Sequence, residues 1–169
     1  NDFGQLGTGD TRTLGNNGNE MGNNLDSVEL GSGVVPVALS SGEGFTCALL
    51  NNGRVKCFGR NSFGQLGYGD TRHRGNDFGE MGNSLPYVEL GDDLTVLKIT
   101  SGAYHSCAIL SNNLVKCWGA GDLGALGYGD TRDRGNNSDE MGNFLPYVDL
   151  GTGRTAVDIR ATVEGTCAI

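Results

Sequence analysis

The sequence has few of the residues that mark metal sites and membrane spans. Its 169 residues include two histidines, one tryptophan and three prolines, and 7% of them are aromatic. No apolar run approaches the ~20 residues of a membrane-spanning helix, so we expect no insertion into a membrane. The cysteines show no C-x2-4-C spacing and no second histidine cluster accompanies them, which argues against zinc. We therefore expect neither a metal nor a cofactor.

Positive charge is also scarce. Lysine and arginine total 12 against 20 aspartates and glutamates, which gives a formal net charge of −8. Binding to the phosphates of nucleic acid requires a basic surface. The composition therefore predicts no nucleic-acid partner, and a protein partner is the expected alternative.

What the sequence does contain is a strict repeat. The segment that begins at Asn1 returns at Asn61 and again at Gly121, an offset of 60 residues that does not drift. The 30 glycines recur at fixed places within these periods. Such a period indicates one supersecondary unit copied and stacked. We divide the chain into the periods 1–60, 61–120 and 121–169 and expect a fragment of a longer array.

Each period predicts four short strands joined by turns, without helical periodicity. The expected strands are 28–30, 87–90 and 147–150; 34–39, 94–99 and 155–159; 45–50 and 105–110; 55–59 and 115–119. Pro36 has no N–H to donate, so we expect it at a strand start or on an edge. This pattern predicts an all-β fold built from propeller blades. A β-solenoid and a tandem of small separate domains are the alternatives.

The cysteines follow the same register. They are Cys47, Cys57, Cys107, Cys117 and Cys167. If Leu50 faces Arg54 across a short hairpin loop, the first two cysteines lie directly opposite each other, and the next two do the same one period later. Opposed residues in a non-hydrogen-bonded pair have Cα atoms ~4.5 Å apart, which a disulfide tolerates. The partner expected for Cys167 would lie past the end of this chain.

Two disulfides in register would place the protein in an oxidising compartment. We therefore expect an extracellular or cell-surface location. The alternative is reduced, buried cysteines that fill small core sites, in which case a cytoplasmic location is expected.

The glycine-rich motif resembles that of a known repeat family. Phe63-Gly64-Gln65-Leu66-Gly67, Trp118-Gly119 and the segment 101–110 are similar to the regulator of chromosome condensation repeat. The resemblance implies a seven-bladed β-propeller, of which this chain would supply about three four-stranded blades. Family members include a nuclear exchange factor for the GTPase Ran, a secreted β-lactamase inhibitory protein and interaction domains of larger proteins, so fold alone does not define function.

The chain departs from the nuclear members in its paired cysteines and in a long loop within each unit. It resembles the cysteine-bearing extracellular versions more closely. No residue of the exchange factor's catalytic machinery can be carried over to a matching position.

The long loops 11–24, 71–84 and 131–144 are the best functional candidates, because loops beyond ~12–15 residues are usually functional or disordered. Their charged side chains form the predicted partner-binding set: Asp70, Arg72, Arg74, Glu80, Asp130, Arg132, Arg134 and Glu140. Two alternatives remain open. These groups could pair within or between loops, or they could bind calcium, although the EF-hand spacing is absent.

Other features favour structure over chemistry. The glycine motif lacks the helix N-terminus and lysine of a phosphate cradle. His105 is matched by Phe45 in the preceding unit, so the position does not require imidazole chemistry. His73 corresponds to Asp133, which predicts a tolerant surface site. No Ser-His-Asp arrangement is visible, and we expect no catalytic residues.

The sequence therefore predicts a non-enzymatic protein-interaction propeller of a secreted or surface protein, which binds through loops gathered on one face. The alternative is a guanine-nucleotide exchange regulator of a small GTPase. A purely structural spacer is a third possibility.

Overall fold

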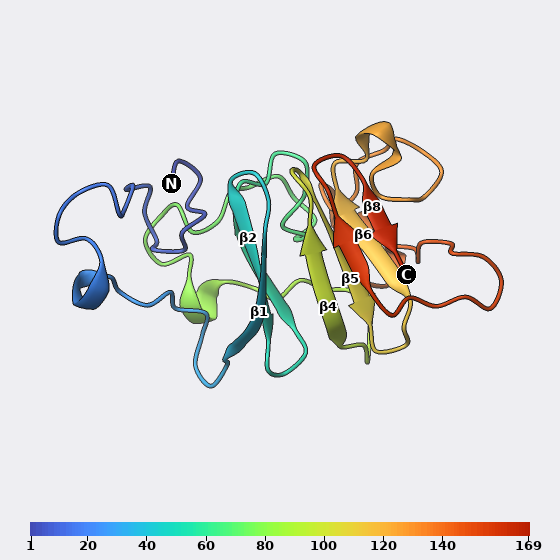
Figure 1. The fold of residues 1–169 in the computed structure, drawn as a ribbon, viewed down its shortest axis with the longest axis horizontal. Coiled ribbons are helices and arrows are strands. Elements are labelled where there is room, and N and C mark those ends of the chain that lie inside the picture. Colours follow the sequence, from blue (N-terminus) through green and yellow to red (C-terminus); the bar gives the residue numbers. More distant parts are fainter.

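The computed structural model describes residues 1–169 and is all-β, with three small antiparallel sheets side by side (Figure 1). The strands are β1 (Pro36–Ser41), β2 (Phe45–Leu50), β3 (Val55–Gly59), β4 (Val96–Ser101), β5 (His105–Leu110), β6 (Val115–Gly119), β7 (Ile159–Ala161) and β8 (Thr166–Ala168). Five single-turn 3-10 helices lie outside the sheets: η1 (Gly22–Asn24), η2 (Gly82–Ser84), η3 (Asp122–Gly124), η4 (Ser138–Glu140) and η5 (Gly142–Phe144). No helix has the length and apolarity that a bilayer span requires.

The hairpin strands of the first two sheets, β2 with β3 and β5 with β6, match the predicted ranges residue for residue. The first strand does not, because β1 and β4 begin and end two residues later than expected, and β7 begins only at Ile159. Strands β1 and β4 each have a break in register near the start, between Pro36 and Ala38 in β1 and between Val96 and Lys98 in β4. Pro36 begins β1, which is an edge strand of its sheet, as its missing N–H requires.

The prediction of four-stranded blades is wrong in detail. Two sheets have three strands and the last has two. The expected fourth strand, 87–90, makes one backbone bond to β3, from the N–H of Val88 to the oxygen of Val55 (2.8 Å). The hydroxyl of Tyr68 occupies the next ladder position, because it accepts from the N–H of Cys57 (2.9 Å) and lies within bonding distance of its carbonyl (2.8 Å). A side chain therefore replaces the strand there.

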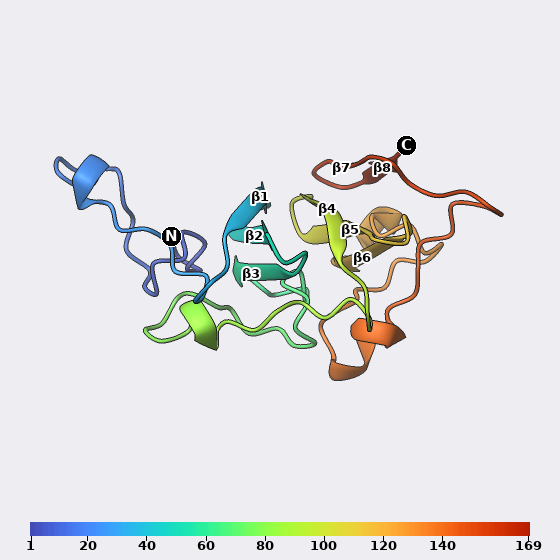
Figure 2. The same cartoon turned by 90° about the horizontal axis from the view of Figure 1, so that it is seen from below.

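Figure 2 shows the order of the layers. Strands β1 and β4 and the β7–β8 pair lie on one side of the molecule, and the helices η2 and η5 of the long loops lie on the other side, beyond β3 and β6. The largest apolar core fills the space between the first two sheets and includes Phe45, Ile99 and Trp118. Leu66 of the glycine motif is fully buried in that core. The sheets thus stack face to face as propeller blades do.

The cysteine pairing is confirmed. Cys47 pairs with Cys57 in the ladder and is bonded to it, with Cα atoms 4.1 Å apart, and Cys107 is bonded to Cys117 in the same way. All four are buried, while Cys167 is a free, exposed thiol.

Candidate functional site

The acidic and basic residues at the start of each long loop bind one another. Arg74 donates two parallel hydrogen bonds to Asp70 (Nη1–Oδ1 3.0 Å, Nη2–Oδ2 2.7 Å), and its guanidinium lies 4.7 Å from the centroid of the Tyr68 ring. Bidentate pairs of this kind combine strength with a defined geometry. The pair therefore fixes the direction in which the loop leaves the glycine motif.

The next unit repeats this arrangement. Arg134 donates to Asp130 at 3.0 and 2.9 Å and lies 4.1 Å from the Tyr128 ring. The hydrogen bond from Arg134, together with the N–H of Arg132, holds the pKa of Asp130 well below its usual range. Asp130 is therefore an anion that is already bonded at neutral pH.

The glutamate of each loop binds the loop's own backbone. One carboxylate oxygen of Glu140 accepts hydrogen bonds from the N–H groups of Gly135 (3.0 Å), Asn136 (3.2 Å) and Asn137 (3.2 Å). Glu80 accepts from Gly75 (2.9 Å) in the same manner. Charge-assisted bonds to several N–H groups close the loop on itself, so it is an ordered element.

A buried lysine joins consecutive loops, and sequence reasoning missed it. Lys56 is the second residue of β3, is 2% exposed, and donates to the carbonyl oxygens of Leu30 (2.7 Å) and Gly82 (2.8 Å). Lys116 does the same one period later, with Leu90 and Gly142 at 2.8 Å each. The available signal was a lysine at the same place in two otherwise apolar strands.

The predicted partner-binding residues thus fall into two groups. Six of them are bonded inside their own loop: Asp70, Arg74, Glu80, Asp130, Arg134 and Glu140. The side chains of Arg72 and Arg132 extend into solvent, and that of Arg132 makes a 3.4 Å contact with the Asp130 carboxylate. Contact of this whole set of residues with a partner stays a prediction. The structure shows in addition that most members of the set stabilise the loop in which they lie.

The loops 71–84 and 131–144 line the outer side of the sheet array, beyond β3 and β6 (Figure 2). The segment that follows the first of them bonds to β3 through Val88, and the segment that follows the second bonds to β6 through Val148. The candidate site is therefore this outer surface, which we call the rim.

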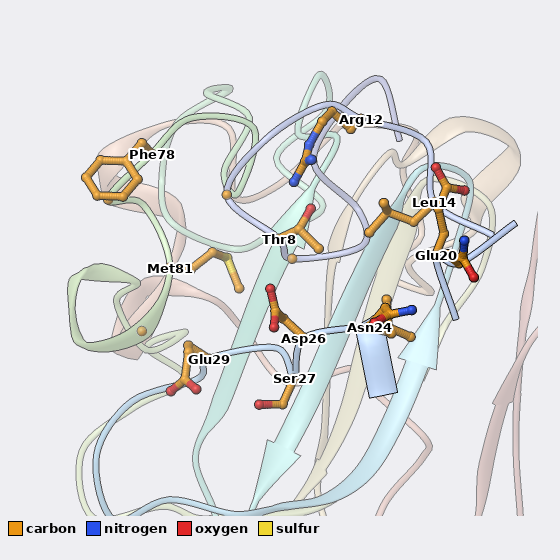
Figure 3. Close-up of a pocket in the computed structure, with 16 residues that line it drawn as sticks. Thr8, Arg12, Leu14, Glu20, Asn24, Asp26, Ser27, Glu29, Phe78 and Met81 are labelled. Atoms are coloured by element: carbon orange, nitrogen blue, oxygen red, sulfur yellow. The ribbon is translucent and has the colours of Figure 1, made fainter. Parts of the chain in front are cut away.

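A groove separates consecutive loops on the rim. The first groove, about 740 Å³ in volume, lies between the loop of the first unit and Phe78 and Met81 of the second (Figure 3). The next groove, about 530 Å³, is lined mostly by the equivalent residues one period later, with Asn143 and Phe144 in addition. The first groove is the larger one, and shorter side chains line it: Thr8, Leu14 and Ser27 stand where the second unit has Tyr68, Arg74 and Tyr87.

The glycine motif is structural. Gly64 has φ +78°, and a Cβ there would come within 2.4 Å of the carbonyl carbon of Gly135. The backbone oxygen of Gln65 accepts from the Ser106 hydroxyl (3.1 Å) and from the indole N–H of Trp118 (3.0 Å). The motif therefore directs its polar groups into the neighbouring sheet.

The two histidines are structural as well. His105 is buried, which lowers its pKa, and its Nε2 lies 2.9 Å from the Thr166 hydroxyl. His73 is half-buried, and its Nδ1 accepts from the N–H of Asn61 (3.0 Å), which differs from the tolerant surface site expected. Asp133 supplies the same acceptor to Gly121 (3.0 Å). No group of three or more His, Cys, Asp or Glu side chains is placed to bind a metal.

Comparisons with known proteins agree with this architecture. A family model described as the regulator of chromosome condensation (RCC1) repeat matches residues 37–65 and 96–125, and a second model of the same description matches residues 52–109. Together they span just over half of the chain.

Among curated proteins, the chain is 33% identical over 129 residues to the human E3 ubiquitin-protein ligase HERC2, covering 76% of this chain and 2% of that protein. It is 31% identical over 131 residues to a bifunctional serine/threonine-protein kinase/NEDD4-like E3 ubiquitin-protein ligase of Dictyostelium discoideum, covering 75% and 6%. The chain therefore spans only a small part of the length of these relatives.

Among solved structures, yeast RCC1 (Prp20) bound to Kap60 superposes with a TM-score of 0.65 at 17% identity, covering 99% of this chain and 36% of that one. Human WBSCR16 superposes with a TM-score of 0.57 at 20% identity, covering 82% and 31%. At these identities the likeness shows the fold, a partial β-propeller.

Proposed function

The chain belongs to the regulator of chromosome condensation (RCC1) repeat family, and on that premise we propose that it is a non-enzymatic protein-interaction module. Two comparisons support the proposal. Yeast RCC1 (Prp20) is described in a complex with Kap60. The region that matches this chain is 6% and 2% of the length of the two curated ligases, so most of each ligase lies outside the match.

Two phenylalanines on the rim carry the proposal. Phe78 is fully exposed and lines the first inter-loop groove, and Phe144 is 76% exposed and lines the second. Aromatic residues are enriched in protein–protein interfaces. The bonds from Glu80 and Glu140 order these loops in advance, which lowers the entropy cost of binding.

The test uses substitutions that the repeat itself supplies. Ser138 stands at the position of Phe78, and Ser84 stands at the position of Phe144, so Phe78→Ser and Phe144→Ser copy residues that this fold accepts. Partners captured on the immobilised chain are identified by mass spectrometry, and their affinities are then measured by calorimetry. We expect the double variant to bind at least about tenfold more weakly, roughly 1.4 kcal/mol.

The control is Val37→Thr, which removes an exposed apolar side chain from β1, far from the rim. It should leave the affinity unchanged. Equal affinity of the wild type and the double serine variant for every captured partner would reject the rim as the binding surface.

We also propose an extracellular or cell-surface location, supported by the two buried disulfides. Protein alkylated in denaturant at the moment of cell lysis, without reductant, should keep the Cys47–Cys57 and Cys107–Cys117 bonds. Alkylation of these four cysteines without reductant would favour the cytoplasmic alternative.

The alternative function is that of a guanine-nucleotide exchange regulator. The fold that this chain shares with yeast RCC1 supports it, but no individual residue of this chain does. It predicts faster nucleotide release from a small GTPase when the chain is added. An unchanged release rate would leave the interaction module as the preferred function.

A further inference from the structure

Most contacts of this chain recur at an offset of 60 residues and so serve the repeated architecture. One exposed cluster does not recur. Arg60 has Ala120 at the equivalent position of the next unit, and Glu43 and Tyr104 likewise have no counterpart of the same type. With Phe3 and Phe63, these residues form what we call the Arg60 cluster. Because the repeat does not require it, the cluster is a candidate for a specific function.

Three aromatic rings surround the guanidinium group of Arg60. Its central carbon lies 5.2 Å from the centroid of Phe3, 6.0 Å from that of Phe63 and 5.1 Å from that of Tyr104. Cation–π contacts of this kind hold an arginine in place without using its N–H groups. The side chain is 25% exposed, so the group is both ordered and accessible.

The guanidinium of Arg60 forms one long hydrogen bond and one loose ion pair, with Glu43. The guanidinium makes a 3.4 Å contact from Nε to the hydroxyl of Ser62. Its Nη1 lies 3.7 Å from the carboxylate of Glu43, too far for a hydrogen bond, and the Glu43 side chain is 61% exposed. Arginine carries five N–H donors in a planar fork. By contrast, Arg74 uses its fork on Asp70.

The cluster lies on a rigid surface away from the rim. Glu43 belongs to the turn between β1 and β2, and its N–H donates to the oxygen of Ala103 in the next such turn (2.8 Å). The N–H of Ala103 donates in turn to Val163 (3.1 Å). The turns of all three sheets are thus linked in a row, which presents the rings and the arginine on one fixed surface.

We propose that the Arg60 cluster binds an aspartate or glutamate side chain of a protein partner, with an apolar neighbour of that residue packed on the rings. Neither Nη atom of the guanidinium forms a hydrogen bond, and a carboxylate bonds to such an edge with two parallel hydrogen bonds. Arginine flanked by aromatic rings is also the composition of binding hot spots.

The wider charge of the chain is compatible with this ligand. The net charge of −8 disfavours a polyanion such as nucleic acid. A single carboxylate meets mainly the local field, because charges beyond ~8 Å are screened at physiological salt. Glu43, the acidic side chain nearest to Arg60, would compete with the partner's carboxylate for the guanidinium N–H groups.

The test rests on the proposed protein-binding function but needs no identified partner. The full chain, labelled with 15N, is titrated with the blocked peptide acetyl-Leu-Asp-Leu-amide and, separately, with acetyl-Leu-Asn-Leu-amide. The Nε–Hε signal of Arg60 and the ring signals of Phe63 and Tyr104 are followed. We expect a saturable shift with the aspartate peptide and none with the asparagine peptide.

Variants then separate the contribution of the planar guanidinium group of Arg60 from that of its positive charge. Arg60→Lys keeps the positive charge but loses the fork, and should weaken binding at least fivefold. Glu43→Gln removes the competitor and should strengthen binding severalfold, which a merely structural role would not produce. Arg154→Ala removes an exposed arginine that lies outside both the rim and the Arg60 cluster, and is the matched control, with unchanged binding expected.

Three results would overturn the proposal: no saturable shift, equal shifts with both peptides, or equal binding by Arg60→Lys and the wild type. Its failure differs from failure of the rim proposal. Captured partners that lose affinity in the phenylalanine variants, while the Arg60 signal never responds to peptide, would reject the Arg60 site and keep the interaction module.

Discussion

Lys56 on β3 donates a 2.8 Å hydrogen bond to the carbonyl oxygen of Gly82, 26 residues away in the long loop of the next unit. The same Nζ reaches Leu30, 26 residues away in the other direction, and lies 4.8 Å from the centroid of the Tyr87 ring. No carboxylate accompanies this buried ammonium. Two backbone carbonyls and one aromatic face hold its charge, so it connects two loops to the sheet.

Replacing this lysine should be costly. Lys56→Met keeps most of the side-chain volume but leaves two carbonyls without their charged donor, and we expect a loss of about 2–3 kcal/mol in the free energy of unfolding. Urea denaturation followed by tryptophan fluorescence would measure it, because Trp118 is buried in the main core.

The matched control is Lys98→Met, since the Lys98 side chain is 34% exposed and pairs with Asp158. Exposed ion pairs contribute little, so a loss under about 1 kcal/mol is expected. A similar loss in both variants would contradict the connecting role of Lys56.

The number of cysteines that react with iodoacetamide should depend on the state of the protein. Native protein treated with iodoacetamide should gain one carbamidomethyl group, on Cys167, because the other four cysteines are bonded and buried. Denaturation without reductant should still give one group, and reduction of the denatured chain should give five. Mass spectrometry of the intact chain reads all three states. Five groups on denatured, unreduced protein would show that the disulfides are absent.

The hairpins could be predicted from the sequence because their determinants are local. A three-residue loop with a glycine or asparagine sets the register, and Leu50 N–H bonds to Arg54 (2.9 Å) as that register requires. Pairing of Cys47 with Cys57 follows directly. The repeat strengthened each inference, because the same turn and the same spacing occur twice.

The rest depends on contacts that periodicity does not contain. The prediction of a fourth strand is wrong because the Tyr68 hydroxyl forms hydrogen bonds with the backbone N–H and carbonyl of Cys57. The alternation of apolar residues in the sequence does not reveal these bonds. The place of the loops follows from how the sheets stack, which brings Met141 into the same core as Trp118. The role of Lys56 requires carbonyls from two distant loops, so the sequence alone could show only its unusual setting.

Acid should destabilise the fold through its histidines. Burial, and for His73 the charge of Arg60, lower the pKa of both His73 and His105 below 6.5. The folded state therefore binds protons less readily than the unfolded state, and stability present above the unfolded pKa is lost as pH falls through the folded value. Protonation also removes the acceptor that His73 offers to Asn61.

Two substitutions taken from the repeat test this dependence. His73→Asp copies Asp133, and His105→Phe copies Phe45. Urea denaturation at a series of pH values should show the free energy of unfolding of the wild type falling between about pH 7 and 5. The double variant should show a flatter profile there. Parallel profiles would mean that neither histidine governs the acid response.

The order of the long loops should depend on their glutamates. Glu140→Ala removes one carboxylate oxygen that accepts from three backbone N–H groups, those of Gly135, Asn136 and Asn137. Hydrogen exchange should accelerate at these three amides by roughly tenfold, because local opening then costs about 1.4 kcal/mol less. Amides of β5 in the same protein serve as an internal reference and should not change.

The matched variant is Glu164→Ala, which removes an exposed glutamate from the turn between β7 and β8. It should leave exchange in the long loop unchanged. If the rim binds partners through ordered loops, Glu140→Ala should also weaken the binding of any partner that contacts Phe144. The loop would then lose conformational entropy on binding, which lowers the affinity. Slow exchange that survives the loss of Glu140 would mean that other contacts hold the loop.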